Sequence, residues 1–590
     1  MGSREEVQVD VTIIGTVAII GTVAIIVIVA VTSLAPRVGV SAPLLLVLAG
    51  VAIGFLPMVP EVAIDPEWIL GGLLPPLLYS SAVNMPAMDF RRDFRTISAF
   101  SVILVVVSAL VVGYSIHLLV PDVGLATGIA LGAIVSPTDG VATAIVRRSG
   151  VSPRVVTVLE GESLLNDASA LVLLRSAIAA TAGAVSLWGV AGDFVYAVIV
   201  AALIGVVVGK INLAIRRRLH QVTGSVAVSF VVPFAAFLPA EHLGASGLVA
   251  AVAAGLVTGH DAPRLLGAED RLNEQVVWRT VEMLLESAVF LIMGVELYGL
   301  VEEVRDEHGS LWLALGLGML TALLVILVRA VFVAVSLWLL ARRARRGPVV
   351  REKLEELRDG IDRGAFRTPE HIDDERVHHR YAERLRRARY RASKRISDID
   401  YLTDQAFGPR EGVVLLWAGM RGAVTLAAAQ SLPADTPQRS VLILVAFVVA
   451  GGTLMVQGGT LGWLVRRLGL DGARAASADE AEELRAHLAE VARTRLADPS
   501  LRRPDGHEYS RESIDHALIR LRANRDDVPE SGSAAEITEQ RQLFAEIIRM
   551  ERDELLRLRD LGSFSSQSLA RSLRVLDSIQ IGIQLRQAEE

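Results

Sequence analysis

The amino-acid sequence predicts an all-α polytopic membrane protein with a small helical cytoplasmic tail. Of its 590 residues, 52% are hydrophobic, and the mean hydropathy of +0.45 is higher than soluble enzymes usually reach. Apolar stretches of about 20 residues, the length that crosses a bilayer as a helix, recur from residue 10 to residue 466. Long polar segments occur only before the twelfth of these stretches and after the last.

Thirteen apolar segments are candidate membrane spans, although the ninth is short. They cover residues 10–32, 39–58, 67–84, 96–119, 122–146, 154–181, 187–214, 221–239, 244–259, 276–300, 310–341, 411–432 and 438–466. The first segment contains Ile-Ile-Gly-Thr-Val-Ala twice, follows acidic residues and lacks a cleavage-site pattern after it. We therefore expect an uncleaved span there, and not a signal peptide.

Basic residues mark alternate loops between the predicted spans. They are Arg91, Arg92 and Arg95, then Arg147, Arg148 and Arg154, then Lys210, Arg216, Arg217 and Arg218, then Arg264 and Arg271. Because Lys and Arg stay on the cytoplasmic side, we expect a multi-pass protein of the cell membrane with its N-terminus outside and its C-terminus in the cytoplasm. An odd number of spans also requires the two termini to lie on opposite sides.

Composition excludes several kinds of partner. The chain has no Cys, so there is neither a disulfide framework nor a thiolate metal site to consider. Its net charge of −6 is small for this length and suggests no nucleic-acid partner. The expected environment is a lipid bilayer.

Two polar regions divide the chain into three predicted parts. Residues 342–410 are dense in Arg, and we expect a solvated helical hairpin near anionic lipid headgroups. Residues 470–590 show amphipathic periodicity, which is typical of a helical regulatory or assembly tail. We expect a Ser/Gly-rich break in this tail near residues 531–533. The transmembrane domain then occupies residues 10–466.

One short motif places ionisable groups inside the sixth predicted span. Residues 161–169 read Gly-Glu-Ser-Leu-Leu-Asn-Asp-Ala-Ser, and a carboxylate at that depth costs about 3 kcal/mol or more unless it faces a polar cavity with partners. Helical spacing puts Ser163, Asn166 and Asp167 on one face, with Glu162 one turn before Asn166. That face offers oxygen ligands together with a titratable acid, which is what exchange of a hard cation against a proton requires.

A second motif, Ser136-Pro137-Thr138-Asp139-Gly140, interrupts the fifth span. Proline lacks the backbone N–H and clashes with the preceding turn, and discontinuous helices of this kind point at ion sites in secondary transporters. A simple proline kink is the alternative, but a kink does not require an intramembrane acid such as Asp139.

The twelfth span contains a matching break at Gly419-Met420-Arg421-Gly422. It lies seven spans after the first break, so the two helices run in opposite directions, as in an inverted repeat. Counting from the nearest loop arginines puts Asp167 about 20 Å and Arg421 about 16 Å along their helices, and Arg329 of the eleventh span is at a similar depth. Such buried arginines need an anionic partner, for which Glu162 and Asp139 are available.

These segments resemble the NhaP-type bacterial sodium/proton antiporters, relatives of the animal sodium/proton exchangers. The matching stretches are Leu73–Leu78 (LLPPLL), Ser136–Asp139 (SPTD), Gly161–Ala168 (GESLLNDA) and Gly419–Val424 (GMRGAV). The resemblance covers residues 10–466, and the Gly161–Ala168 motif is highly specific. It implies a homodimer in which a moving core and a scaffold share the transmembrane helices.

The resemblance also implies a role for each motif residue. Asp167 would carry the transported Na⁺ or Li⁺ and the proton in turn, beside the neutral Asn166. Ser163 and Thr138 would supply further ligands to Na⁺. The remaining roles are architectural, with Glu162 paired to Arg329, and with Asp139 and Arg421 ordering the crossed, broken helices. No cofactor is implied besides the transported ions.

One departure from the family concerns the cation pathway. The family commonly carries an acid two residues after Leu-Leu-Pro-Pro-Leu-Leu, whereas this chain has Ser80.

The sequence predicts a transporter and not an enzyme. One carboxylate beside a neutral residue can hold one cation or one proton, so we expect electroneutral exchange by alternating access at Asp167. A K⁺/H⁺ antiporter and a gated cation channel regulated by the tail remain alternatives, and a channel would need a continuous pore. A non-transporting membrane sensor would leave the ion-ligand face without a purpose.

Overall fold

A computed structural model describes residues 2–56, 65–183, 187–219, 221–306, 310–345, 347–365, 375–422, 424–470, 473–503, 505–522 and 533–588. Every regular element within these ranges is a helix, as expected where a bilayer offers backbone groups no water to bond with. Eight of the described helices have, on their own, the length and hydropathy of a membrane span. The all-α membrane fold is thus confirmed, and the count of thirteen spans stays a prediction.

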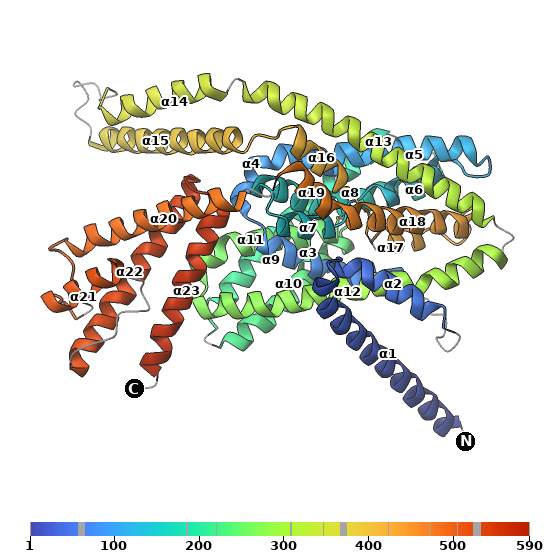
Figure 1. Cartoon of the computed structure of the whole chain (residues 1–590), viewed down its shortest axis with the longest axis horizontal. Helices are drawn as coiled ribbons and strands as arrows, with labels where there is room; N and C mark the ends of the chain where they lie inside the picture. The colour runs from blue at the N-terminus through green and yellow to red at the C-terminus, as the bar shows by residue number, and fades with distance from the viewer. Residues whose placement is uncertain are drawn as a thin grey trace. The chain divides into compact units, whose positions relative to one another are not determined.

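The chain folds as two compact units, of which the first comprises Met1–Leu265, Glu274–Trp338 and Phe407–Asp471. Figure 1 traces its helices in chain order. Their bounds are α1 Gly2–Val38, α2 Ala42–Gly54, η1 Trp68–Leu73, α3 Leu74–Asn84, α4 Ala87–Ser98, η2 Ala99–Ile103, α5 Leu104–Leu119, α6 Leu125–Val135, α7 Val141–Arg148, α8 Pro153–Ala182, α9 Leu187–Arg216, α10 Val222–His242, α11 Gly247–Leu265, α12 Ala268–Asp306, α13 Leu311–Ala344, α16 Pro409–Trp417, α17 Val424–Gln430, α18 Arg439–Thr453, η3 Leu454–Gly458 and α19 Gly459–Leu468.

The fourth predicted span begins earlier than its hydropathy indicated. Helix α4 is amphipathic and continues through the π-helical turn η2 into α5, so one helical run extends from Ala87 to Leu119. Its buried Asp93 accepts hydrogen bonds from the Arg154 guanidinium of α8, with an Nη2–Oδ1 distance of 2.8 Å. This ion pair lets a charged helix pack inside the unit.

Small residues allow close helix packing around α3. On α11, a Cβ atom at Gly255 would meet the carbonyl oxygen of Tyr79, and one at Gly259 would meet the backbone of Val83. Interfaces of this kind are typical of membrane helices, where small residues let backbones approach. The contact fixes the position of α3 and therefore of Ser80.

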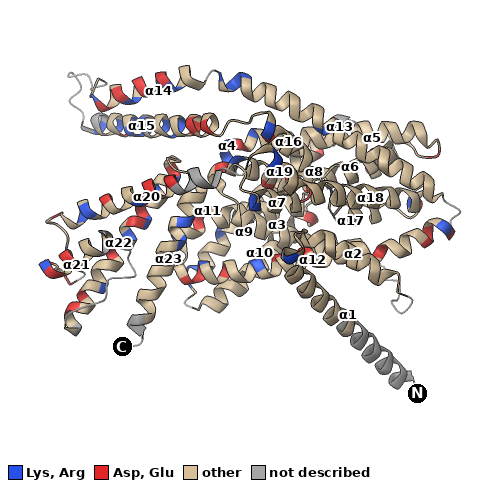
Figure 2. Cartoon of the chain, viewed as in Figure 1, with Lys and Arg blue, Asp and Glu red and all other residues tan. Residues whose placement is uncertain are grey.

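The second unit comprises Leu266–Asn273, Leu339–Ala406 and Gly472–Glu590. Its further helices are α14 Gly347–Asp362, α15 Glu375–Asp404, α20 Ala473–Leu496, α21 Arg511–Arg522, α22 Ala534–Leu561 and α23 Ser566–Ala588. Helices α14 and α15 lie side by side, and Figure 2 shows how densely their surfaces are charged. Of the Ser/Gly-rich break predicted near residues 531–533, the first two residues lie outside the described ranges.

Tail helices pack on one another and on α15 within this unit. Leu484, Leu488, Ile547 and Leu576 lie in the tail interior. The tail also contains an acidic run at residues 479–483. Its Glu480 accepts hydrogen bonds from the Ser565 backbone N–H and from both Ser565 and Ser568 hydroxyls at the start of α23.

Candidate functional site

The two predicted helix breaks meet inside the first unit. One separates α6 from α7 and the other separates α16 from α17. The Asp139 backbone N–H donates a hydrogen bond to the Met420 carbonyl, with an N–O distance of 2.9 Å. A Cβ atom at Gly422 would collide with the Asp139 carboxylate, so glycine is needed for this approach. Broken helices leave backbone N–H and C=O groups unpaired. The hydrogen bond between Asp139 and Met420 pairs an N–H group of the first break with a C=O group of the second.

Arg421 satisfies the carbonyl groups that the breaks leave open. Its Nε donates to the Val135 carbonyl at 2.8 Å and its Nη2 to the Ser136 carbonyl at 3.4 Å, while its Nη1 bonds to the Gly419 carbonyl. The sequence argument expected a carboxylate partner, but these partners are backbone oxygens. The physical reason is that the C-terminal carbonyls of α6 and α16 carry partial negative charge.

Glu162 and Arg329 form a buried ion pair between α8 and α13. Both residues are 1% exposed, and the Arg329 Nη2 donates to Glu162 Oε2 at 2.9 Å while Nη1 bonds to Oε1. The Arg329 Nε donates to the Leu415 carbonyl at 2.9 Å. The guanidinium therefore links α8, α13 and α16, next to the second helix break.

A short hydrogen-bond chain connects this ion pair to the first break. The Thr138 hydroxyl donates to Glu162 Oε1 at 3.1 Å and accepts from Asn166 Nδ2 at 2.8 Å. This orients Asn166, whose buried Oδ1 has no hydrogen-bond partner among the described residues. An amide oxygen is thus left available beside Asp167.

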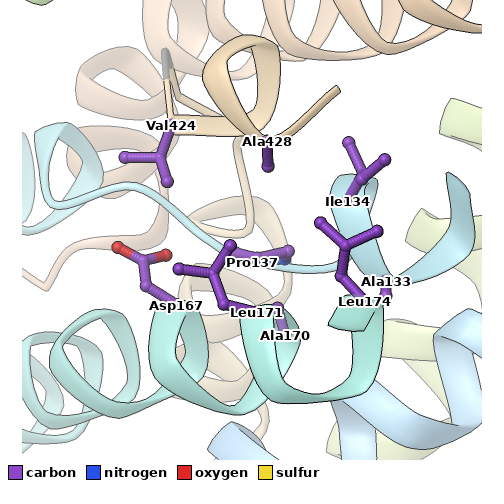
Figure 3. A pocket seen from close by; sticks show the side chains of 9 residues that line it. All are labelled: Ala133, Ile134, Pro137, Asp167, Ala170, Leu171, Leu174, Val424 and Ala428. Carbon is purple, nitrogen blue, oxygen red and sulfur yellow. The ribbon is translucent and has the colours of Figure 1, made fainter. Parts of the chain in front are cut away.

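Asp167 lies at the edge of a small pocket between α6, α8 and α17. Asp167 is the single ionisable residue among those that line it. Figure 3 shows its carboxylate facing Val424 across the space, with Pro137 of the first break beside it. The lining is Ala133, Ile134, Pro137, Asp167, Ala170, Leu171, Leu174, Val424 and Ala428. A carboxylate among apolar side chains needs a counter-ion or a proton.

Not every predicted ligand faces this pocket. Thr138, Ser163 and Asn166 are absent from its lining, and the Ser163 hydroxyl donates to the Glu160 carbonyl in its own helix at 3.1 Å. Asp139 lies within electrostatic range of Asp167. Its Oδ1 accepts from the Val141 N–H at 3.3 Å, and its Oδ2 is buried with no hydrogen-bond partner in the described part of the chain.

Two acids of α12, Glu282 and Glu286, lie near the site. Sequence reasoning gave neither of them a role in ion transport. Glu286 lies within electrostatic range of Asp139 and of Glu282, and the Glu282 carboxylate accepts hydrogen bonds from Ser80 and Ser81 of α3. Their spacing of four residues within a predicted span was a usable signal, because it places two acids on one helix face.

Known proteins resemble this chain in sequence over most of the first unit. A family model described as "Sodium/hydrogen exchanger, transmembrane" matches residues 23–467, which include the whole site. An uncharacterized Na⁺/H⁺ exchanger of Mycobacterium tuberculosis is 30% identical over 443 residues, or 74% of this chain and 71% of that protein. A sodium, potassium, lithium and rubidium/H⁺ antiporter of Bacillus subtilis is 31% identical over 277 residues, or 45% of this chain and 41% of that protein.

A solved structure has a similar fold. The sodium proton antiporter MjNhaP1 from Methanocaldococcus jannaschii matches with a TM-score of 0.51 and 17% identity, covering 76% of this chain and 97% of that chain. At this identity the likeness concerns the fold alone.

Proposed function

The chain belongs to the sodium/hydrogen exchanger family, and we propose that it exchanges Na⁺ or Li⁺ for H⁺ at Asp167. Membership makes it a multi-pass membrane protein and a monovalent cation/proton antiporter of the NhaP type, that is, a transporter and not an enzyme. The cation, the stoichiometry and the residue that carries both ions are the substance of the proposal.

The observation that supports Asp167 most strongly is its setting. It is 8% exposed and borders an apolar pocket in which no other residue is ionisable. A bare carboxylate is costly there, whereas a bound cation or proton neutralises it. The neighbouring Asn166 is uncharged, so one Na⁺ or one H⁺ balances the site and the exchange is electroneutral.

Neutral oxygens near Asp167 would complete the cation site. The Asn166 Oδ1, which has no hydrogen-bond partner among the described residues, is the first candidate. The hydroxyls of Thr138 and Ser163 donate hydrogen bonds elsewhere, so each would join the site through its lone pairs or after a rotation of its side chain. Hard monovalent cations suit such oxygen ligands.

Transport would proceed by alternating access. A neutralised Asp167 can pass through an apolar, closed state, and a charged one cannot do so cheaply. We further propose a homodimer in the cell membrane, as the family resemblance implies. The alternation of basic loops supports an N-terminus outside and a C-terminus in the cytoplasm.

Cation-driven proton movement in sealed proteoliposomes tests this function. Addition of Na⁺ or Li⁺ should move protons, and the rate should not depend on an imposed membrane potential. K⁺/H⁺ exchange is the second candidate, since the Bacillus subtilis relative is named for potassium as well. Cation flow without any proton movement would instead indicate a channel.

We propose that the tail beyond residue 470 tunes exchange and takes no part in the ion pathway. Asp577 of α23, which is 3% exposed, accepts hydrogen bonds from Arg552 at 2.8 Å and from Arg271 at 2.5 Å. Arg271 belongs to the first turn of α12, and residues 266–273 fold with the tail in one compact unit. Because α12 is continuous to Asp306, this ion cluster can act on the membrane helix.

Removal of the tail after Gly472 should therefore leave cation/proton exchange intact but shift its dependence on salt or pH. Asp577→Asn should reproduce the shift in the full chain, because it removes the charge that holds Arg271. Glu508→Gln, at a tail glutamate whose side chain is 77% exposed, is the matched control and should not. Complete loss of exchange in a truncated protein that still inserts would mean that the tail belongs to the mechanism. A parental salt and pH profile in both variants would show that the tail does not tune exchange.

A further inference from the structure

A carboxylate on α12 reaches α3 where the chain carries Ser80. The Ser80 hydroxyl, 1% exposed, donates to Glu282 Oε2 at 3.1 Å, and the Ser81 hydroxyl donates to Oε1 at 3.4 Å. Both oxygens of the carboxylate are thus engaged by donors. That arrangement suits an ionised carboxylate, which can only accept hydrogen bonds.

Two anchors on the same face of α12 hold Glu282 in this position. The Arg216 guanidinium donates to both oxygens of Glu274 at 2.7 and 2.9 Å. Four residues later, the Trp278 indole N–H donates to the Ser229 hydroxyl at 2.9 Å, and its ring packs against Tyr79 of α3. Glu282 follows after four more residues, so it shares the anchored face.

A row of four acidic residues extends from Glu282 through Glu286 and Asp139 to Asp167. Glu286, one turn further along α12, is within electrostatic range of both Glu282 and Asp139, and Asp139 is within range of Asp167. Arginines lie near the outer part of this row, with Arg147 and Arg279 in electrostatic range of Glu282 and Arg148 in range of Glu286. Arg147 also forms an ion pair with Glu160.

Two buried oxygen atoms near Asp167, at the inner end of this row, accept no hydrogen bond from the described residues. Asn166 is 1% exposed, and neither its Oδ1 nor the Asp139 Oδ2 has a hydrogen-bond partner among the described residues. Unsatisfied buried acceptors are costly, and a cation bound at Asp167 would satisfy the Asn166 oxygen. These acceptors point to a ligand that is positively charged.

We propose that a cation passage follows this row of acids to Asp167 and that Glu282 attracts the monovalent cation into it, supplying from α12 the carboxylate that α3 lacks at Ser80. This inference rests on the proposed function and adds a residue to it. Glu282 lies in the N-terminal half of α12, on the side that basic loops place in the cytoplasm. A fixed negative charge in such a passage raises the local cation concentration without taking part in the exchange step.

Glu282→Gln should therefore raise the half-saturating Na⁺ concentration about tenfold and leave the maximal rate of proton movement within about twofold of the parent. Glu303→Gln is the matched control, because it removes the same charge from the far end of α12, where Glu303 is 43% exposed and lies 3.7 Å from Arg439. The control should keep the parental half-saturation.

A charge swap separates this role from a structural one. Ser80→Glu combined with Glu282→Ser returns a carboxylate to the same space from α3 and should restore the parental half-saturation. Ser80→Gln combined with Glu282→Ser has the same bulk without the charge and should not. Equal half-saturation in the two double variants would overturn the proposal, and so would parental half-saturation in Glu282→Gln. If the parental protein moved no protons at all, the proposed function itself would fail, and the two failures are therefore distinguishable.

Discussion

Replacement of Asp167 by Asn is expected to abolish cation/proton exchange while the protein remains folded and inserted. Asn has nearly the same shape as Asp but can neither release a proton nor neutralise a cation. Asp167 is the single ionisable residue of the pocket, so no neighbour can replace its charge there. The loss should reach the detection limit of Na⁺-driven proton movement in proteoliposomes.

The control for this variant is recovery of the protein by size-exclusion chromatography in detergent. Removal of a carboxylate from an apolar pocket should not lower its stability, since burial of a charge is unfavourable. Transport near the parental rate in Asp167→Asn would contradict the assignment.

Replacement of Arg329 by Ala is expected to destabilise the folded protein strongly. The change leaves Glu162, 1% exposed, without its ionic partner, and removal of one partner from a buried pair typically costs about 3–5 kcal/mol. It also leaves the Leu415 carbonyl without the Arg329 donor. Thermal unfolding in detergent measures the effect.

Two further variants identify the cause of this destabilisation. Addition of Glu162→Gln to Arg329→Ala should recover part of the stability, because it removes the unpaired charge. Arg175→Ala breaks an ion pair with Glu241 in which the arginine is 62% exposed, and it should cost about 1 kcal/mol or less. If the double variant were no more stable than Arg329→Ala alone, the two residues would not depend on one another.

The residue types within each span predicted the two helix breaks and the polar residues of the site. Pro137 and the glycines around Arg421 indicated the breaks at residues 136–140 and 419–422, because proline and glycine interrupt helices in a known way. The carboxylate and amide of residues 162–167 stood out because apolar segments rarely contain them. Helical periodicity placed Asp167 on one face with Ser163 and Asn166, and the family resemblance singled it out among the acids of the motif.

Sequence reasoning did not identify most hydrogen-bond partners that lie far apart in the chain. Residue spacing placed Arg421 deep in its span, but one of the carbonyl groups that it binds belongs to α6, 286 residues away. Ser80 and Glu282 are 202 residues apart, and Arg271 and Asp577 are 306 apart. Periodicity describes which face of a helix is apolar, and it does not say which other helix that face meets.

Helix boundaries depended on such distant contacts as well. The charged helix α4 was expected to be part of a loop, since three arginines precede the apolar stretch. The bidentate contact between Asp93 and Arg154 compensates part of that charge and extends the helix. Long-range ion pairs can thus override local hydropathy at the end of a span.

Competition between Na⁺ and H⁺ for one carboxylate is the central claim, and the pH dependence of the half-saturating Na⁺ concentration tests it most directly. In proteoliposomes containing the full chain, this concentration should rise about tenfold for each unit of falling pH once Asp167 is mostly protonated. The maximal rate at saturating Na⁺ should change far less, because enough cation displaces the proton. A half-saturation that does not change with pH would contradict a shared site, and a hundredfold rise per unit would mean that two protons compete with each cation.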